Sequence, residues 1–164
     1  MTQLYTQVRL EDWVRGPLDV FDSEVARANK RGVEAHFEAE WNGDIEATMR
    51  TIHPDEPWQV IHGFGVNVRG YEAVRDYYNA RFGSWPGPAM DYFARVTVTD
   101  TAAIFEGTLN IEPQGEWAGQ QAEGAKISVP CVIVVDMRDG LVLGETVYLD
   151  SAGALAQISG GSRG

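Results

Sequence analysis

Two titratable side chains, Glu145 and His62, stand inside apolar stretches of the sequence, where burial changes the pKa of an ionisable group. Glu145 lies within residues 141–149, a stretch that is apolar at both alternating positions of a strand. A buried carboxylate without a partner is costly, and its pKa rises towards the range in which a general base works. His62 stands between Val60 and Phe64 and could donate or relay a proton. The two side chains therefore indicate acid–base chemistry.

Each candidate also has a structural explanation. Glu145 could pair with a surface arginine or with a partner subunit, and His62 could be a hydrogen-bonded core residue. Glu106 lies in the middle of a predicted strand, could face either side, and is a second candidate acid. Tyr148 falls on the face opposite Glu145, where an interface or core phenol is expected, although a bulge would turn its hydroxyl into a pocket.

Other kinds of chemistry find little support in the sequence. It contains no His/Cys/Asp cluster at metal-ligand spacing and no nucleophile elbow, and residues 63–65 are too short for a dinucleotide loop. We therefore expect no metal and no cofactor. Cys131, the single cysteine, is expected to be a small buried apolar residue. His36 should be packed or lie off the pocket, and His53 should shape a proline-containing turn.

The composition limits the partners of this 164-residue chain. Its formal net charge is -11, from 24 acidic and 13 basic residues, which argues against binding nucleic acid or an anionic membrane surface. The N-terminus lacks the pattern of a signal peptide, and no apolar run approaches the roughly 20 residues of a membrane helix. We therefore expect a cytoplasmic protein of one domain.

The pattern of apolar residues predicts three helices followed by strands. A helix from Ser23 to about Trp41 should bury Val33, Phe37 and Trp41, which recur every four residues. A short helix follows Asp44, and a third follows Gly70. The expected extended segments are residues 58–68, 92–99, 102–111, 127–135 and 141–149. A polar loop is expected at 113–124. A short helix after Asp150 closes the chain.

This order predicts an α+β fold, with helices segregated on one face of a curved antiparallel sheet. Residues 127–135 and 141–149 are apolar on both faces, so a second subunit is expected to cover the face without helices. We therefore expect a homodimer. The expected divisions are an N-terminal extension at 1–20, a domain at 21–159 and a flexible tail at 160–164.

An ordered set of short motifs resembles the nuclear transport factor 2 superfamily and, within it, the SnoaL-like group. The motifs are Asn42-Gly43-Asp44, Ile52-His53-Pro54-Asp55, Gly70-Tyr71-Glu72-Ala73-Val74, Asp139-Gly140, and Glu145–Asp150 running into Leu155–Ile158. The resemblance implies a cone-shaped domain with a pocket between the sheet and three helices, and commonly a dimer. Its members include polyketide cyclases, ketosteroid isomerase, limonene epoxide hydrolase and proteins without known activity, so the fold does not define the function.

The sequence departs from the catalytic residues of those relatives. Where the polyketide cyclases have a basic aspartate supported by histidine, glutamine and asparagine, this chain has Val147, Ile133, Cys131 and Trp58. The epoxide hydrolases use an Asp-Arg-Asp arrangement, but residues 102–111 contain no arginine. If the chain is an enzyme, its site has been rebuilt.

The same alignment suggests which residues face the pocket. If Val147 faces the cavity, so do Leu143, Glu145 and Leu149, because every second residue of a strand shares a face. If Trp58 lines the pocket, Val60, His62 and Phe64 share its face.

The first hypothesis is therefore a cofactor-independent cyclase or isomerase acting on an apolar carbonyl compound such as a polyketide, terpenoid or steroid-like molecule. Glu145 would be the base and His62 the acid or oxyanion donor. The expected substrate-binding residues are Trp58, Tyr78, Phe93, Glu106, Ile133, Val147 and Tyr148.

Two other hypotheses remain. One is a non-catalytic protein that binds a small hydrophobic ligand, and the other is an interaction subunit that uses loop 113–124. Glu145 and His62 within hydrogen-bond reach would favour chemistry, and a wholly apolar lining would favour binding.

Overall fold

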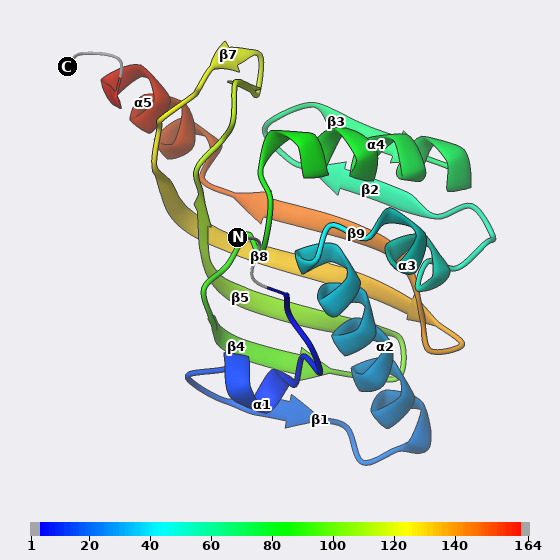
Figure 1. The fold of residues 1–164 in the computed structure, drawn as a ribbon. Helices are drawn as coiled ribbons and strands as arrows, with labels where there is room; N and C mark the ends of the chain where they lie inside the picture. Colours follow the sequence, from blue (N-terminus) through cyan, green and yellow to red (C-terminus); the bar gives the residue numbers. More distant parts are fainter. Residues whose placement is uncertain (1–3, 162–164) are drawn as a thin grey trace.

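The computed structural model describes residues 4–161 as a curved seven-stranded sheet with three helices along one side (Figure 1). The helices are α1 (Leu10–Trp13), α2 (Glu24–Trp41), α3 (Ile45–Arg50), α4 (Tyr71–Ser84) and α5 (Ser151–Gly161). The strands are β1 (Leu18–Val20), β2 (Trp58–Ile61), β3 (Val66–Arg69), β4 (Phe93–Val98), β5 (Ala102–Ile111), β6 (Glu116–Trp117), β7 (Gln120–Gln121), β8 (Ile127–Arg138) and β9 (Leu141–Leu149). The expected α+β class is confirmed.

The sheet has the order β1-β4-β5-β8-β9-β2-β3. Its four central strands are antiparallel, as the two predicted hairpins require. The sheet is not antiparallel throughout, because β1 runs parallel to β4 and β2 runs parallel to β9. The parallel β2–β9 pair brings the first part of the domain beside its last strand, which is important for the site.

Local signals place the two helices that begin the domain. The Ser23 hydroxyl accepts a hydrogen bond of 2.9 Å from the backbone N–H of Ala26 and so caps α2. The Asp44 carboxylate caps α3 in the same way. The predicted inward stripe of Val33, Phe37 and Trp41 is buried, as expected. The stripe fixes which side of α2 faces the sheet.

A bulge in β9 changes one of the predicted orientations. Asp136 pairs with Gly144, whereas Met137 pairs with Val142, so Leu143 is an extra residue in the strand. Val142, not Leu143, is therefore the fully buried residue before Glu145. The expectation that Leu143 faces the cavity is wrong, since strict alternation is interrupted at this point.

The N-terminal extension packs on the domain. Leu10 is fully buried, and the ring of Trp13 lies 4.4 Å from that of Trp41 on α2. Strand β1 then joins the edge of the sheet. At the other end, α5 continues through Gly161, two residues into the expected tail at 160–164. Residues 162–164 of that tail, and residues 1–3 of the extension, lie outside the described residues.

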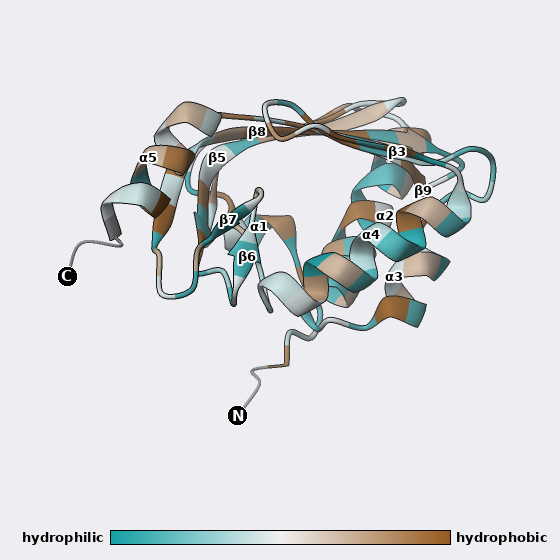
Figure 2. Cartoon of the chain, turned by 90° about the horizontal axis from the view of Figure 1, so that it is seen from above, coloured by the Kyte–Doolittle hydropathy of each residue, from teal (hydrophilic) through white to brown (hydrophobic). Residues whose placement is uncertain are grey.

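Helices α2, α3 and α4 all lie on the same side of the sheet (Figure 2). The opposite face, which we call the outer face, includes Ile104, Val132, Val134 and Tyr148, because these residues alternate with the inward-facing ones. In the described part of the chain, none of the helices is both long and apolar enough to cross a membrane.

Candidate active site

A cavity of about 250 Å³ lies between the sheet and helices α2 and α4. Its wall is largely apolar and aromatic and includes Phe37, Trp41, Ile61, Phe93, Ile133 and Val147. The small β6–β7 hairpin also contributes, because Trp117 lies on this wall and packs against Phe64 and Trp85. The expected polar loop at 113–124 is therefore partly ordered as a hairpin and helps to enclose the cavity.

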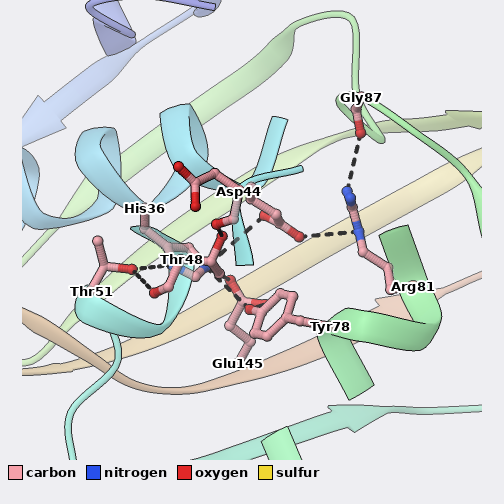
Figure 3. A network of polar contacts seen from close by, with 9 residues as sticks. His36, Asp44, Thr48, Thr51, Tyr78, Arg81, Gly87 and Glu145 are labelled. Atoms are coloured by element: carbon pink, nitrogen blue, oxygen red, sulfur yellow. Dashed lines mark hydrogen bonds and ion pairs between the residues drawn. The ribbon is translucent and has the colours of Figure 1, made fainter. Parts of the chain in front are cut away.

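A carboxylate, a phenol and an imidazole meet at the wall of this cavity. The Tyr78 hydroxyl donates to Glu145 Oε2 at 3.2 Å, and His36 Nε2 lies 3.4 Å from Glu145 Oε1. His36 Nε2 is also 3.2 Å from the Tyr78 oxygen. Figure 3 shows how α2, α4 and β9 bring these three side chains together. Glu145 is 6% exposed and lines the cavity, so both of its oxygens are held from inside the protein.

The other ring nitrogen of His36, Nδ1, is held by Thr51 at the C-terminal end of α3. Thr51 donates its hydroxyl hydrogen to the carbonyl oxygen of Thr48 at 2.6 Å. Because the hydroxyl has only one hydrogen, it must accept from His36 Nδ1, which lies 2.7 Å away. Nδ1 therefore carries a proton, and the imidazole presents Nε2 towards Glu145.

A second carboxylate, Glu40, stands one helical turn beyond His36 on α2. Its Oε1 forms an ion pair with Arg81 Nε at 3.2 Å, and its Oε2 lies 4.0 Å from His36 Nε2. Arg81 is 4% exposed and also donates from Nη2 to the backbone carbonyl of Gly87 at 3.2 Å. Glu40 and Arg81 both line the cavity, so two ion pairs share its polar end.

The surroundings push the two carboxylate pKa values apart. Burial acts to raise the pKa of Glu145, but the hydrogen bonds and charge of His36, with the Tyr78 hydroxyl, hold it below its ordinary value. Burial raises the pKa of Glu40 against the opposing effect of Arg81, and the charge of Glu145 raises it further. Burial acts to lower the pKa of His36, but Glu145 and Glu40 outweigh it, so this pKa is raised.

This difference assigns chemical roles to the two carboxyl groups. Glu145 is the ionised one and can accept a proton, while Glu40 is the one that holds a proton more readily. A protonated His36 satisfies Glu145 as a charge partner, with Nε2–H directed at the carboxylate. The arrangement is competent for proton transfer within an apolar cavity.

The same side chains are the candidate ligands for a metal ion within residues 4–161. One ligand atom each from His36, Glu40 and Glu145 lies within 4.8 Å of the others. However, these atoms are already engaged with Tyr78 and Arg81, and the guanidinium beside Glu40 opposes a further cation. Linear spacing in the sequence did not reveal this group, and the absence of a metal stays a prediction.

The structure brings together five of the predicted site residues. Glu145, Phe93, Ile133 and Val147 line the cavity. Tyr78 lies directly behind Glu145, with its ring fully buried. The alternating pattern of β8 and β9 after the bulge accounts for these placements.

Two predictions fail because the assigned face of β2 is wrong by one residue. Gln59 and Ile61 line the cavity. Trp58 lies on the outer face, and its ring covers Gly144 so closely that a Cβ atom added at Gly144 would stand 2.3 Å from it. The prediction that His62 faces the pocket is wrong as well, because its exposed ring stacks on Tyr148 at 4.7 Å.

Two further predicted site residues lie on the outer face. Glu106 is exposed and stands 3.6 Å from Arg95, so it does not reach the cavity. Tyr148 is 49% exposed, because the bulge of β9 comes before Glu145 and leaves the alternation after it unchanged. Neither side chain contributes to the cavity wall.

Sequence reasoning missed His36, Glu40 and Arg81. One signal was present, since His36 and Glu40 are four residues apart and therefore share a face of α2. That face adjoins the apolar stripe of Val33, Phe37 and Trp41. A histidine and a glutamate beside the stripe that packs on the sheet would have indicated a buried polar pair.

The fold and the cavity define a single-domain α+β protein with an acid–base cluster in an apolar pocket. The family model described as the SnoaL-like domain matches residues 33–144, more than half of the chain, so the protein belongs to this family. The resemblance seen in the sequence motifs is thus confirmed. No curated protein matches the chain significantly.

Solved structures show the same fold at low sequence identity. A protein provisionally called a SnoaL-like polyketide cyclase, from Jannaschia sp. CCS1, has 21% identity and a TM-score of 0.71, covering 85% of this chain and 96% of that one. An LEH-like epoxide hydrolase from M. tuberculosis has 17% identity and a TM-score of 0.64, covering 83% and 92%. TsrD from Streptomyces laurentii has 23% identity and a TM-score of 0.60, covering 80% and 96%.

Proposed function

We propose that the protein is an acid–base enzyme that isomerises or cyclises a small apolar carbonyl compound, without a cofactor. The observation that carries the proposal is the Glu145 carboxylate at the wall of an apolar cavity, with Tyr78 and His36 on its two oxygens. A carboxylate in this position can remove a proton from a carbon beside a carbonyl group.

In the proposed reaction, Glu145 accepts the proton as the C–H bond breaks, and the electron pair moves to the carbonyl oxygen to form an enolate. For an isomerisation, a proton is then returned to a different carbon. For a cyclisation, the enolate carbon attacks a second carbonyl of the same molecule. The π bond of that carbonyl breaks, and its oxygen takes the proton that Glu145 had accepted. Glu40 supports the return of the proton, because burial raises its pKa. His36 and Tyr78 hold Glu145 ionised and oriented.

The proposal is tested by exchange of carbon-bound hydrogen in heavy water, which needs no knowledge of the natural substrate. A panel of apolar ketones, including 2-tetralone, is incubated with the protein, and deuterium uptake beside the carbonyl is followed by NMR. We expect uptake above the buffer rate, reduced by about a hundredfold in Glu145→Gln. Glu106→Gln is the matched control, since Glu106 is an exposed glutamate on the outer face.

One observation favours a second candidate function, the non-catalytic binding of a hydrophobic ligand. Both oxygens of Glu145 already have partners within the protein, so its carboxylate also has a purely structural explanation. This alternative predicts that a small molecule co-purifies and is detected by native mass spectrometry, while no ketone of the panel exchanges faster than in buffer. Exchange that depends on Glu145 would exclude it.

A further inference from the structure

Three buried polar atoms of cavity-lining residues have no hydrogen-bond partner within the described part of the chain. They are Gln59 Oε1, Arg81 Nη1 and Trp85 Nε1. Gln59 is 2% exposed and Arg81 is 4% exposed, so neither side chain can turn to bulk solvent. An unsatisfied buried donor or acceptor is costly, and at the wall of a cavity a ligand atom can satisfy it.

The two unpaired donors, Arg81 Nη1 and Trp85 Nε1, belong to neighbouring side chains at the C-terminal end of α4. The guanidinium carbon of Arg81 lies 5.1 Å from the ring centroid of Trp85 and 5.1 Å from that of Phe82. Its Nε forms an ion pair with Glu40, and its Nη2 donates a hydrogen bond to the carbonyl oxygen of Gly87. Arg81 is therefore held by four neighbours, and Nη1 is the nitrogen that remains available.

We infer that Arg81 Nη1 and Trp85 Nε1 form a binding site for a negatively polarised oxygen of the ligand. Both atoms are donors, one belongs to a cation, and both belong to rigid planar groups in the largely apolar lining of the cavity. Such fixed donors stabilise an oxyanion more than a neutral oxygen.

The inference deepens the proposed function and rests on it for the chemistry, because the oxygen would be the carbonyl oxygen that becomes an enolate. It narrows the substrate class to compounds whose reactive carbonyl can enter the cavity as far as α4. The Arg81 guanidinium places a positive charge at this end of the cavity, and burial raises the pKa of Glu40 beside it. Hydrocarbon ligands would leave both donors unsatisfied.

The test uses 4-nitrophenol, a planar probe whose phenolate absorbs visible light, so that both protonation states are measured when it is bound to the whole protein. We expect the wild-type protein to bind the phenolate at least about tenfold more tightly than the phenol, which lowers the pKa of the bound probe by about one unit. Trp85→Phe keeps an aromatic ring but removes the N–H, and it should remove most of this preference.

Two comparisons separate the donor effect from a change of shape. Trp117→Phe removes an indole from the same wall and should weaken both forms of the probe equally, leaving the preference unchanged. Arg81→Lys keeps the charge but loses Nη1, and it should reduce the preference as Trp85→Phe does. Equal binding of the two forms by the wild-type protein, absence of binding at millimolar probe, or an unchanged preference in Trp85→Phe would each overturn the inference.

The result is independent of turnover. Glu145→Gln, which tests the proposed function through hydrogen exchange, should retain the preference for the phenolate. A phenolate preference without hydrogen exchange in the wild-type protein would reject the proposed function and retain the oxyanion site. Hydrogen exchange without a phenolate preference would retain the proposed function and reject the oxyanion site.

Discussion

The imidazole Nε2 of His36 lies 3.4 Å from a carboxylate oxygen of Glu145, joining the longest helix of the domain to its last strand at the cavity wall. Neither group is stable as a lone charge in this position, because burial penalises both ionised forms. Together they stabilise each other as an ion pair, and the cavity receives an ionised carboxylate. The position of Glu145 therefore depends on α2 as much as on β9.

Replacing Tyr78 with phenylalanine removes the hydroxyl that donates to Glu145 Oε2. We expect the pKa of Glu145 to rise, so the acid limb of the hydrogen-exchange rate moves to higher pH. We also expect a loss of about 1.5–3 kcal/mol in the free energy of unfolding, the usual range for a hydrogen bond to a charged group. Tyr148→Phe on the outer face is the control, and identical pH profiles for the two variants would contradict the assignment.

The raised pKa of His36 predicts how stability depends on pH. Between the unfolded value of 6.5 and the higher folded value, the native protein binds more protons than the unfolded chain, so the free energy of unfolding falls as pH rises. The stability that His36 contributes is complete below pH 6.5 and is lost as pH rises through its folded pKa. The free energy of unfolding falls by up to about 1.4 kcal/mol per pH unit in this range.

Denaturant unfolding at a series of pH values above 6.5 measures this slope. His36→Gln should flatten the slope, because the titrating group is removed. Glu40, whose pKa is raised, also makes the free energy of unfolding fall as pH rises above its unfolded pKa of 4.5. Glu145, whose pKa is lowered, makes the free energy of unfolding rise with pH below 4.5. A wild-type stability that rises with pH above 6.5 would contradict the ion pair.

The sequence predicted helices α2 to α5 and strands β4, β5, β8 and β9, because each has a strong local signal. It did not predict α1, β1, β6 and β7, or the turn that divides residues 58–68 into β2 and β3. Ser23, Asp44 and Gly70 mark helix starts, and the apolar stripe at Val33 and Phe37 fixes the inward side of α2. These signals lie within a few residues of the structure that they specify.

The candidate site was harder to predict, because it depends on contacts that are remote in the sequence. Glu145 was identified from the apolar pattern of its strand, whereas His36 and Glu40 reach it only through the packing of α2 on the sheet. His62 and Trp58 were misplaced because β2 alternates and no local feature fixes its register. Once β2 pairs with β9, Gln59 stands beside Glu145 and His62 faces outward.

The N-terminal extension is expected to be a structural part of the domain. Leu10 is fully buried beside α2, so Leu10→Ala should reduce the free energy of unfolding by about 2–5 kcal/mol. Leu4→Ala provides the matched control, because Leu4 is exposed and its replacement should change the free energy of unfolding little. Equal stabilities of the two variants in denaturant unfolding would show that residues 4–13 do not pack on the domain in solution.

The outer face is our proposed dimer interface. Val132 and Val134 lie on the side of the sheet away from α2–α4 and are only partly buried in the single chain. We expect a dimer by size-exclusion chromatography with light scattering at micromolar concentration. Val134→Glu should shift it to monomer, because a charge would be buried at the interface. Glu123→Lys, at an exposed position in the loop after β7, should leave the mass unchanged. A monomeric wild-type protein would reject the proposal.

The most direct test of the central claim, that a protonated His36 holds an ionised Glu145 at the cavity wall, is a pH titration of the His36 ring nitrogens by ¹⁵N NMR. We expect the pKa of His36 to lie above its ordinary value of 6.5 in the wild-type protein, and Nε2 to lose its proton at lower pH in Glu145→Gln. A His36 pKa at or below 6.5 in the wild-type protein, or an identical titration in Glu145→Gln, would contradict the account.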